Sequence, residues 1–236
     1  MTLVKEFQVK MSAASRTDLL PTIDECSVRT KDHYKLVVLG DSKVGKTSII
    51  HQFLYGKMPP KYSATVEEFH QGEFDLNGTS LTLDIVDTAG SYPFPAMRRL
   101  AITTGDAFIL VYSIDSQKSF EQVRALRDEV LEYCNRQAHI IVVGNKADLE
   151  ERRQVKKELA ETLVEIDWEH GFIETSARSN VNILQIFRKL MNISKIPMEL
   201  TPKVLEKQRR KSLPVHNTQP SLRDQTLLKR NSCNVS

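Results

Sequence analysis

The sequence has few cysteines and no long hydrophobic run. Its three cysteines, Cys26, Cys134 and Cys233, are far apart and odd in number, which argues against a disulfide framework or a cysteine metal cage. We expect reduced thiols, as in the cytosol. No stretch approaches the roughly 18 apolar residues of a membrane-spanning helix, and the N-terminus, with Lys5 and Lys10, is too polar for a signal peptide. These absences favour a cytosolic protein.

Basic and acidic residues are nearly equal in number, and the small basic excess is concentrated near the C-terminal end of the sequence. The chain has 33 Lys and Arg against 30 Asp and Glu, yet residues 201–236 hold eight basic residues and two acidic ones. A hydrophobic content of 40% provides for one core of ordinary size. We predict three parts: a flexible polar extension at 1–33, a folded domain at 34–196 and a disordered basic tail at 197–236.

Short apolar runs alternate with segments of helical periodicity. The expected strands are residues 35–39, 81–86, 107–112 and 140–143, and the expected helices are 47–55, 119–135, 155–169 and 182–191. This alternation predicts an α/β fold with a mostly parallel, doubly wound sheet. Asn77-Gly78, after the alternating segment 68–76, predicts a tight hairpin, so one edge strand should be antiparallel.

A glycine-rich motif follows the first expected strand. The pattern GxxxxGK[ST] is met by Gly40, Asp41, Ser42, Lys43, Val44, Gly45, Lys46 and Thr47, and Ser48 comes next. Glycines let backbone N–H groups surround phosphate oxygens, and a helix N-terminus favours negative charge. We expect Lys46 to neutralise the outer phosphates and Thr47 Oγ1 to bind Mg²⁺. The alternative is a turn that binds nothing, but chance would produce the four fixed positions in about one chain in a hundred.

A second motif, Asn145-Lys146-Ala147-Asp148, follows the strand expected at 140–143. Guanine presents two N–H donors that the Asp148 carboxylate can accept together, whereas adenine does not. A site with such a buried acceptor rejects the wrong analogue by roughly 10⁴ to 10⁵. Asn145 can meet the base edge, and the stem of Lys146 can cover its face. Polar loops of this kind are common by chance, so the position after a strand is what makes the motif informative.

These motifs resemble, in family order, the five guanine-nucleotide motifs of Ras-family small GTPases. They are residues 40–47, Thr65, 87–90 (Asp-Thr-Ala-Gly), 145–148 and 176–177 (Ser-Ala). Residues 91–100, followed by 104–106, are most similar to the Dexras/Rhes branch. The resemblance implies a P-loop GTPase domain that binds GTP or GDP with Mg²⁺. It also implies effector proteins, an exchange factor and a GTPase-activating protein as partners.

The resemblance also assigns roles to single residues. It implies that Thr65 and Asp87 join Thr47 around Mg²⁺, and that the Gly90 N–H meets the γ-phosphate. Ser176 and Ala177 would form the second base-contacting loop. When the γ-phosphate leaves, Thr65 and Gly90 lose a partner, so their two loops relax.

The segment around Thr65 is similar to the family's effector-binding loop. It comprises Tyr62, Ser63, Ala64, Thr65, Val66, Glu67 and Glu68. The alternative is an ordinary solvated strand edge, since charged edges also prevent aggregation. Two positions near the nucleotide depart from the family pattern: Arg178 replaces a lysine and Met58 replaces an aromatic residue. Both departures bear on the rate of nucleotide release.

The catalytic pattern departs from the family at Ser91. A glutamine usually stands there and orients the attacking water, and a serine side chain is too short to reach that water. Ser42 adds a side chain where the Ras branch usually has glycine, which crowds the space for an arginine finger. Other small GTPases tolerate this serine, so Ser91 carries more of the argument. We predict slow hydrolysis, with Lys46, Thr65, Gly90 and Ser91 as the catalytic residues.

The chain ends Cys233-Asn-Val-Ser236, which fits the C-a-a-X prenylation pattern with a serine that favours farnesyl. Asn234 departs from the aliphatic residue usual at its position. One lipid chain binds membranes only marginally, and the basic clusters at 207–211 and 229–230 would add attraction to an anionic inner leaflet. A solvated tail, or a nuclear-import or nucleic-acid patch, is the alternative, but no nucleic-acid partner is expected. The predicted location is the cytoplasmic face of the plasma membrane, with a cytosolic pool.

The leading interpretation is a membrane-associated GTP/GDP switch that hydrolyses GTP to GDP and phosphate. A nucleotide-binding adaptor with negligible hydrolysis, controlled by exchange or abundance, is the alternative that Ser91 favours. A P-loop phosphotransferase is disfavoured by Asp148 and by the lack of a recognisable lid. His33, His51 and His170 show no catalytic partner at a recognisable spacing.

Overall fold

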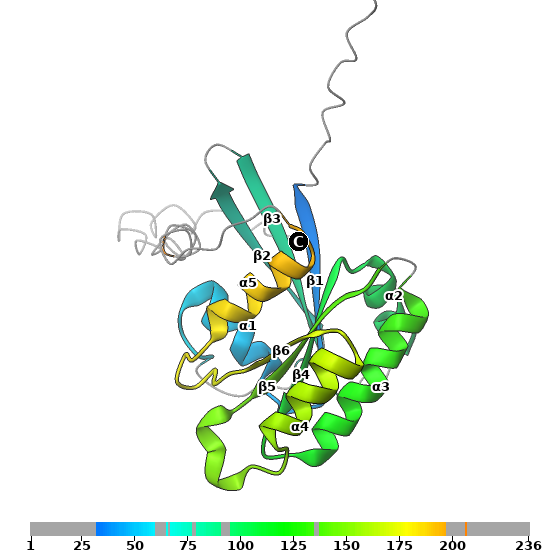
Figure 1. Cartoon of the computed structure of the whole chain (residues 1–236). Coiled ribbons are helices and arrows are strands. Elements are labelled where there is room, and N and C mark those ends of the chain that lie inside the picture. Colours follow the sequence, from blue (N-terminus) through cyan, green and yellow to red (C-terminus); the bar gives the residue numbers. More distant parts are fainter. Residues whose placement is uncertain are drawn as a thin grey trace, which may run out of the picture. The chain divides into compact units, whose positions relative to one another are not determined.

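The computed structural model describes residues 32–59, 65, 67–76, 79–90, 95–134, 137–196 and 206. Its strands are β1 (His33–Gly40), β2 (Glu67–Leu76), β3 (Thr79–Thr88), β4 (Ala107–Ser113), β5 (His139–Asn145) and β6 (Gly171–Glu174). Its helices are α1 (Lys46–Tyr55), α2 (Pro95–Thr104), α3 (Gln117–Tyr133), α4 (Lys157–Thr162) and α5 (Ile183–Ile193), as shown in Figure 1. A 3₁₀ turn, η1 (Ala147–Arg152), follows β5, and a π-helical turn, η2 (Leu163–Asp167), follows α4.

The strands form one sheet in the order β2-β3-β1-β4-β5-β6. Only the β2–β3 pair is antiparallel among the pairings of this sheet, so the predicted α/β fold with one antiparallel edge strand is confirmed. From the central β1 the chain runs to β2 and β3 on one side and then returns to β4 on the other. In such sheets the ligand lies beyond the carboxyl ends of the strands, where the chain order reverses.

Two hydrophobic layers pack on the two faces of the sheet. Because side chains alternate along a strand, Leu36 and Val38 of β1 face the layer that includes α1 and α5, and Val37 faces the other layer. Helices α2, α3 and α4 cover that second face (Figure 1). On the first face, the rings of Phe53 and Phe187 stack with centroids 3.6 Å apart and so join α1 to α5.

The helix predicted at 155–169 is shorter and divided. Val155 donates its N–H to the Ile114 carbonyl, a loop contact that delays the start of α4 to Lys157. At the other end, the Trp168 N–H bonds the Leu163 carbonyl at 3.1 Å, which gives the π-helical turn. The Arg127 guanidinium lies 5.0 Å from the centre of the Trp168 ring.

Two elements were not predicted, and several predictions lie outside the described residues. β6 has only four residues, and α2 buries only Ala101 and Ile102, so neither gives a clear hydrophobic pattern. The turn at 77–78 is outside, although Leu76 and Thr79 on either side are paired in register. The extension and tail are also outside, apart from residues 32, 33 and 206, so the domain boundaries stay predictions.

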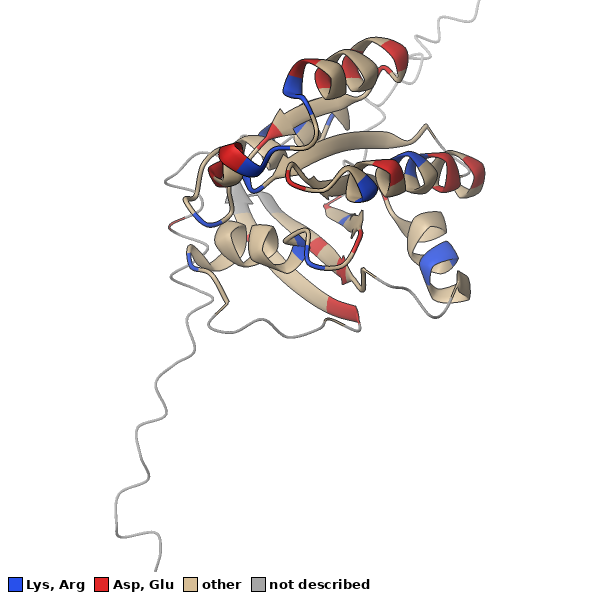
Figure 2. Cartoon of the chain, turned by 90° about the horizontal axis from the view of Figure 1, so that it is seen from below, with Lys and Arg blue, Asp and Glu red and all other residues tan. Residues whose placement is uncertain are grey.

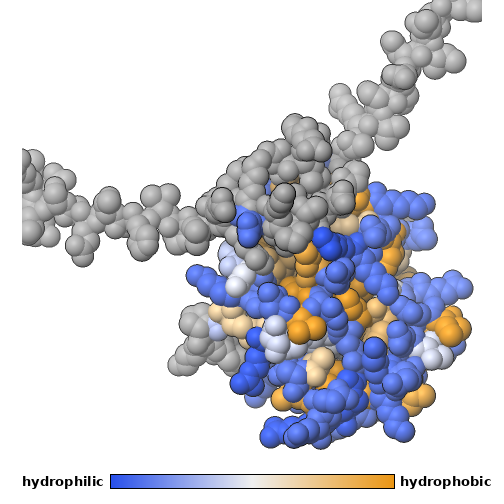
Figure 3. Space-filling view, turned by 60° about the vertical axis from the view of Figure 1, so that its left-hand side comes forward, coloured by the Kyte–Doolittle hydropathy of each residue, from blue (hydrophilic) through white to orange (hydrophobic). Residues whose placement is uncertain are grey.

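The described elements carry charged residues of both signs (Figure 2). Basic and acidic residues are interspersed on the helices rather than separated by sign (Figure 2). On the face in Figure 3, hydrophobic atoms form small groups among hydrophilic side chains. Within the described part of the chain, no helix is long and apolar enough to cross a membrane.

Candidate functional site: a nucleotide cavity

A cavity of about 570 Å³ opens at the carboxyl ends of β1, β3, β5 and β6. Loops from all of the predicted nucleotide motifs contribute to its wall. The lining residues are Ser42, Lys43, Gly45, Lys46, Thr47, Ser48, His51, Met58, Pro59, Thr65, Glu68, Thr88, Gly90, Asn145, Lys146, Asp148, Leu149, Ala177 and Arg178. Its volume lies in the range of small-molecule and cofactor sites.

The loop from Gly40 to Gly45 has a backbone that requires glycine at both ends. Gly45 has a φ of 100°, and a Cβ there would lie 2.3 Å from Asn145 Nδ2. A Cβ at Gly40 would lie 2.2 Å from the Val111 carbonyl oxygen. Helix α1 begins directly after this loop and has no side-chain cap at its N-terminus. Its first N–H groups and its positive dipole end are therefore suited to an anion.

Lys46 is almost completely buried, with 6% of its surface exposed. Its Nζ donates hydrogen bonds to the carbonyl oxygens of Gly40 and Asp41, both at 2.9 Å. Burial lowers the pKa of Lys46 to about 8, while the charges of Asp87 and Asp41 oppose this effect. A phosphate beside Nζ would favour the charged form. The ammonium therefore lies against the backbone at the start of residues 40–45, the predicted phosphate loop.

Three oxygen atoms from separate elements converge beside Lys46. Thr47 Oγ1 donates to Asp87 Oδ2 at 2.5 Å and lies 3.0 Å from Thr65 Oγ1. Asp87 is fully buried, and its Oδ1 has no hydrogen-bond partner. Burial raises the pKa of Asp87, whereas the Thr47 bond and Lys46 lower it.

This oxygen set fits Mg²⁺, which prefers hard oxygen ligands. A buried carboxylate oxygen without a partner is costly, and a bound cation would compensate its charge. The structure thus brings together Thr47, Thr65 and Asp87, the three residues predicted to hold the metal.

The backbone at Gly90 touches the phosphate loop. A Cβ on Gly90 would lie 2.1 Å from Ser42 N and 2.2 Å from Ser42 Cα, so any side chain there would force the two loops apart. The residue predicted to read the γ-phosphate therefore lies against the loop predicted to hold it.

At the other end of the cavity, the Asn145 side chain forms hydrogen bonds that connect its own loop to the loop of Val44 and to the loop at 175–177. Its side chain is 2% exposed. Nδ2 donates to the Val44 carbonyl at 2.8 Å, and Oδ1 accepts from the Ala177 N–H at 3.1 Å and from Thr175 Oγ1 at 3.4 Å. Both ends of the amide therefore hold other parts of the site in place, a role that the sequence did not reveal.

The carboxylate of Asp148 is oriented by Ser176. Ser176 Oγ donates to Asp148 Oδ1 at 2.6 Å and accepts from the Ser179 N–H at 3.0 Å. Lys146 adopts a left-handed backbone conformation with a φ of 65°, and its Nζ lies 3.9 Å from Asp115 Oδ1. Asp115 was not predicted, because nothing in its local sequence marks it as part of the site.

Comparison with known proteins matches residues 35–195 to the Ras family. The chain belongs to the Ras family. It is 42% identical to the GTP-binding protein Rhes of Mus musculus, of Rattus norvegicus and of Homo sapiens, in each case over 186 residues that cover 75% of this chain and 70% of the relative. The predicted family, its Rhes branch and the enzyme class, a small GTPase that hydrolyses GTP, are confirmed.

Some predicted residues of this Ras-family site lie outside the described part of the chain. They are Tyr62, Ser63, Ala64, Val66, Ser91 and Cys233. Of the predicted effector loop, the structure describes Thr65, whose Oγ1 lies 3.0 Å from Thr47 Oγ1, and Glu67 and Glu68 at the start of β2. Met58 and Arg178, the two departures that bear on nucleotide release, both line the cavity.

Two histidines that lack a recognisable partner in the sequence have one in the structure. His33 Nε2 lies 2.6 Å from Asp84 Oδ2 on the neighbouring strand. His51 lines the cavity and packs against His70, with ring centroids 5.6 Å apart. These partners are distant in sequence, so spacing along the chain could not show them.

Proposed function

We propose that this Ras-family chain is a membrane-associated signalling switch that binds GTP or GDP with Mg²⁺ and hydrolyses GTP slowly. One observation carries the nucleotide part of the proposal. The buried Lys46, the Thr47 and Thr65 hydroxyls beside Asp87, and Asp148, whose carboxylate Ser176 orients, lie around one cavity. This arrangement supports a single site with one end for the phosphates and the other for the base.

Each end has a distinct task. Lys46 would bind the outer phosphates, and Asp148 would accept hydrogen bonds from guanine, so that adenine leaves a charged acceptor unpaired. Mg²⁺, held by Thr47, Thr65 and Asp87, would supply positive charge against the phosphate oxygens. Because Thr65 lies within the predicted effector segment, loss of its partners on hydrolysis would release that segment.

The proposal of slow hydrolysis rests on Ser91 and Ser42. Ser91 lacks the reach of the glutamine that orients water in relatives. The Ser42 side chain is exposed at the mouth of the cavity, and its backbone is in contact with Gly90. A side chain there narrows the approach for an arginine from an activating protein, a residue worth roughly 10³ to 10⁵ in rate.

Single-turnover hydrolysis of Mg²⁺-GTP by the full chain tests this proposal. ATP is the control nucleotide, and Ser91→Gln is measured beside wild type. We expect slow GTP turnover that increases at least about tenfold in the glutamine variant, with no ATP turnover. Fast wild-type turnover would disprove the role given to Ser91. Turnover that stays undetectable in both proteins would favour the adaptor alternative, and failure to bind GTP would refute the proposal.

Membrane association is proposed from the tail and needs its own measurement. Cys233 would be farnesylated, and the two basic clusters would add electrostatic binding to an anionic leaflet. We expect the full chain to gain one farnesyl mass with purified transferase and then to bind vesicles containing anionic lipid, less strongly at high salt. Cys233→Ser is the matched control. If wild type and Cys233→Ser bind such vesicles equally, the lipid anchor has no part in attachment.

A further inference from the structure

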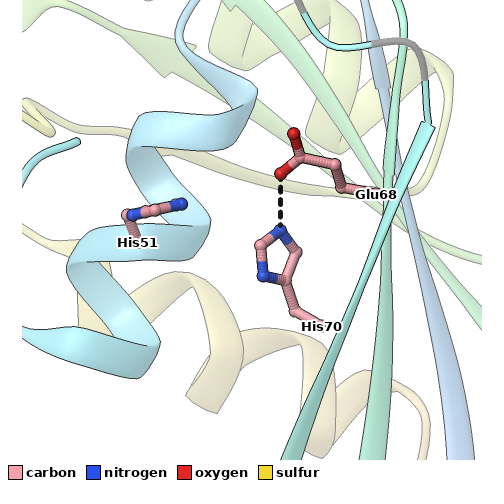
Figure 4. Close-up of side chains that lie close together, drawn as sticks. All are labelled: His51, Glu68 and His70. Carbon is pink, nitrogen blue, oxygen red and sulfur yellow. Dashed lines mark ion pairs between the residues drawn. The ribbon is translucent and has the colours of Figure 1, made fainter. Parts of the chain in front are cut away.

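Three side chains with metal-binding atoms meet between α1 and β2. Figure 4 shows His51 on the helix pointing toward Glu68 and His70 on the strand. One potential ligand atom from each lies within 4.8 Å of the others. Within the described part of the chain, no other group of three His, Cys, Asp or Glu residues is arranged in this way.

His70 provides the independent sign that this cluster binds something. Its side chain is only 9% exposed, and its Nε2 is buried without a hydrogen-bond partner. That atom faces Glu68 Oε2 at 3.6 Å, too far for a hydrogen bond. Buried polar atoms rarely stay unsatisfied in native proteins, so Nε2 is available to a ligand.

Tyr55 lies beside the other nitrogen of the His70 ring. Tyr55 Oη lies 3.3 Å from His70 Nδ1. In the tautomer whose Nδ1–H donates a hydrogen bond to Tyr55 Oη, Nε2 is unprotonated and its lone pair faces the cluster. Metal-binding histidines are usually held in this way by a hydrogen bond from their other ring nitrogen.

The ligand set selects the metal. Two imidazole nitrogens and one carboxylate oxygen are typical of Zn²⁺ sites that leave a fourth position open, whereas Mg²⁺ and Ca²⁺ prefer oxygen alone. Ligand atoms around Zn²⁺ at about 2.0–2.2 Å lie roughly 3.3–3.6 Å apart, so separations of up to 4.8 Å in the cluster must shorten by as much as about 1.2–1.5 Å. The Glu68 side chain is 52% exposed and is free to make this movement.

We propose that His51, Glu68 and His70 form a binding site for one Zn²⁺ ion, with ligands different from those of the proposed Mg²⁺ site. The bound ion would link the start of β2, through Glu68 and His70, to His51 on α1. That point is three residues beyond Thr65 and belongs to the predicted effector segment, so Zn²⁺ would hold in place a part of the chain that responds to nucleotide. This last consequence rests on the proposed function, whereas the metal site does not.

Zinc titration against a chromogenic chelator tests the site. The protein is the full chain without an affinity tag, loaded with GDP and excess Mg²⁺, with its thiols blocked by N-ethylmaleimide so that cysteines do not compete. We expect one Zn²⁺ per chain, and an affinity at least about tenfold weaker in His51→Gln and in Glu68→Gln. Tyr55→Phe should weaken binding by about 10-fold to 100-fold, since it removes only the orienting hydrogen bond. His139→Gln, a histidine on β5, is the matched control and should bind Zn²⁺ like wild type.

Zinc affinity, a cobalt spectrum and GTP binding together distinguish the metal site from its alternatives. Absence of Zn²⁺ binding, or equal affinity in His51→Gln, His139→Gln and wild type, would overturn the site. Replacement of Zn²⁺ by Co²⁺ gives a second readout, because visible absorption typical of four-coordinate Co²⁺ should appear in wild type and be lost in His51→Gln. GTP binding is measured on the same samples. A chain that binds Zn²⁺ but no GTP would refute the proposed function and leave the metal site standing.

Discussion

Replacing Asn145 with alanine tests whether one buried amide holds the nucleotide site together. The change removes the 2.8 Å bond to the Val44 carbonyl and the 3.1 Å bond from the Ala177 N–H. Both backbone groups are buried, and the smaller side chain offers neither a donor nor an acceptor in exchange. The phosphate loop and the loop at 176–177 would lose the contact that sets their separation.

The magnitude follows from the two groups left unpaired. Each buried donor or acceptor without a partner costs about 1–3 kcal/mol, so we expect roughly 2–6 kcal/mol in total. Water entering the space left by the amide would place the value in the lower half of this range, at roughly 2–4 kcal/mol. If half of this free energy is lost only by the GDP-bound state, GDP binding weakens by about 1–2 kcal/mol. GDP release then accelerates about 5-fold to 30-fold.

Two measurements on the GDP-bound protein check this prediction: urea unfolding and the rate of release of a fluorescent GDP analogue. Thr175→Val is the matched control. It is close in shape and removes only the 3.4 Å bond to Asn145 Oδ1, which should cost about 1 kcal/mol or less. Equal effects of Asn145→Ala and Thr175→Val, or unchanged GDP release in Asn145→Ala, would refute the argument.

Two further predictions concern stability. In Gly45→Ala the new Cβ would lie 2.3 Å from Asn145 Nδ2 at a φ of 100°. Left-handed strain of about 1–2 kcal/mol and overpacking of about 1–3 kcal/mol should together lower the free energy of unfolding. An unchanged melting temperature of the GDP-bound protein would contradict this. Burial, followed by the charge of Arg127, lowers the pKa of His170. The folded state therefore binds fewer protons than the unfolded state at mildly acidic pH, and stability should fall as the pH drops below about 6.5. Urea unfolding between about pH 7.5 and 5.5 should show a smaller fall in His170→Gln, and parallel curves would disprove the contribution.

The sequence predicted the elements that carry strong local patterns. The four predicted strands and the helices at 47–55, 119–135 and 182–191 correspond to β1, β3, β4, β5, α1, α3 and α5 within a few residues, because their apolar spacing matches the two layers of the core. β6 is short and α2 is mostly exposed, so their patterns are weak. Motif spacing located the cavity loops at 40–47 and 145–148 for a related reason, since each motif consists of consecutive residues.

What the sequence did not reveal depends on contacts between distant elements. The tie from Asn145 to Val44 and the packing of His51 on His70 join residues from different elements, and no local pattern predicts which face of a strand meets which helix. The same holds for Gly90, whose close approach to Ser42 depends on how two loops meet above the sheet.

The antiparallel pairing of β2 with β3 has a consequence for both proposed cation sites. Glu68 stands opposite Asp87 in this ladder, and opposed residues place their side chains on the same face of a sheet. His70 follows two residues later on that face, whereas Phe69 between them points away and is 68% exposed. A shift of the pairing by one residue would turn Glu68 and His70 outward and Phe69 inward. The alignment of a single pair of strands therefore sets the distance between a proposed zinc ligand and a proposed magnesium ligand, and a change in that alignment would remove the zinc site without altering any of its residues.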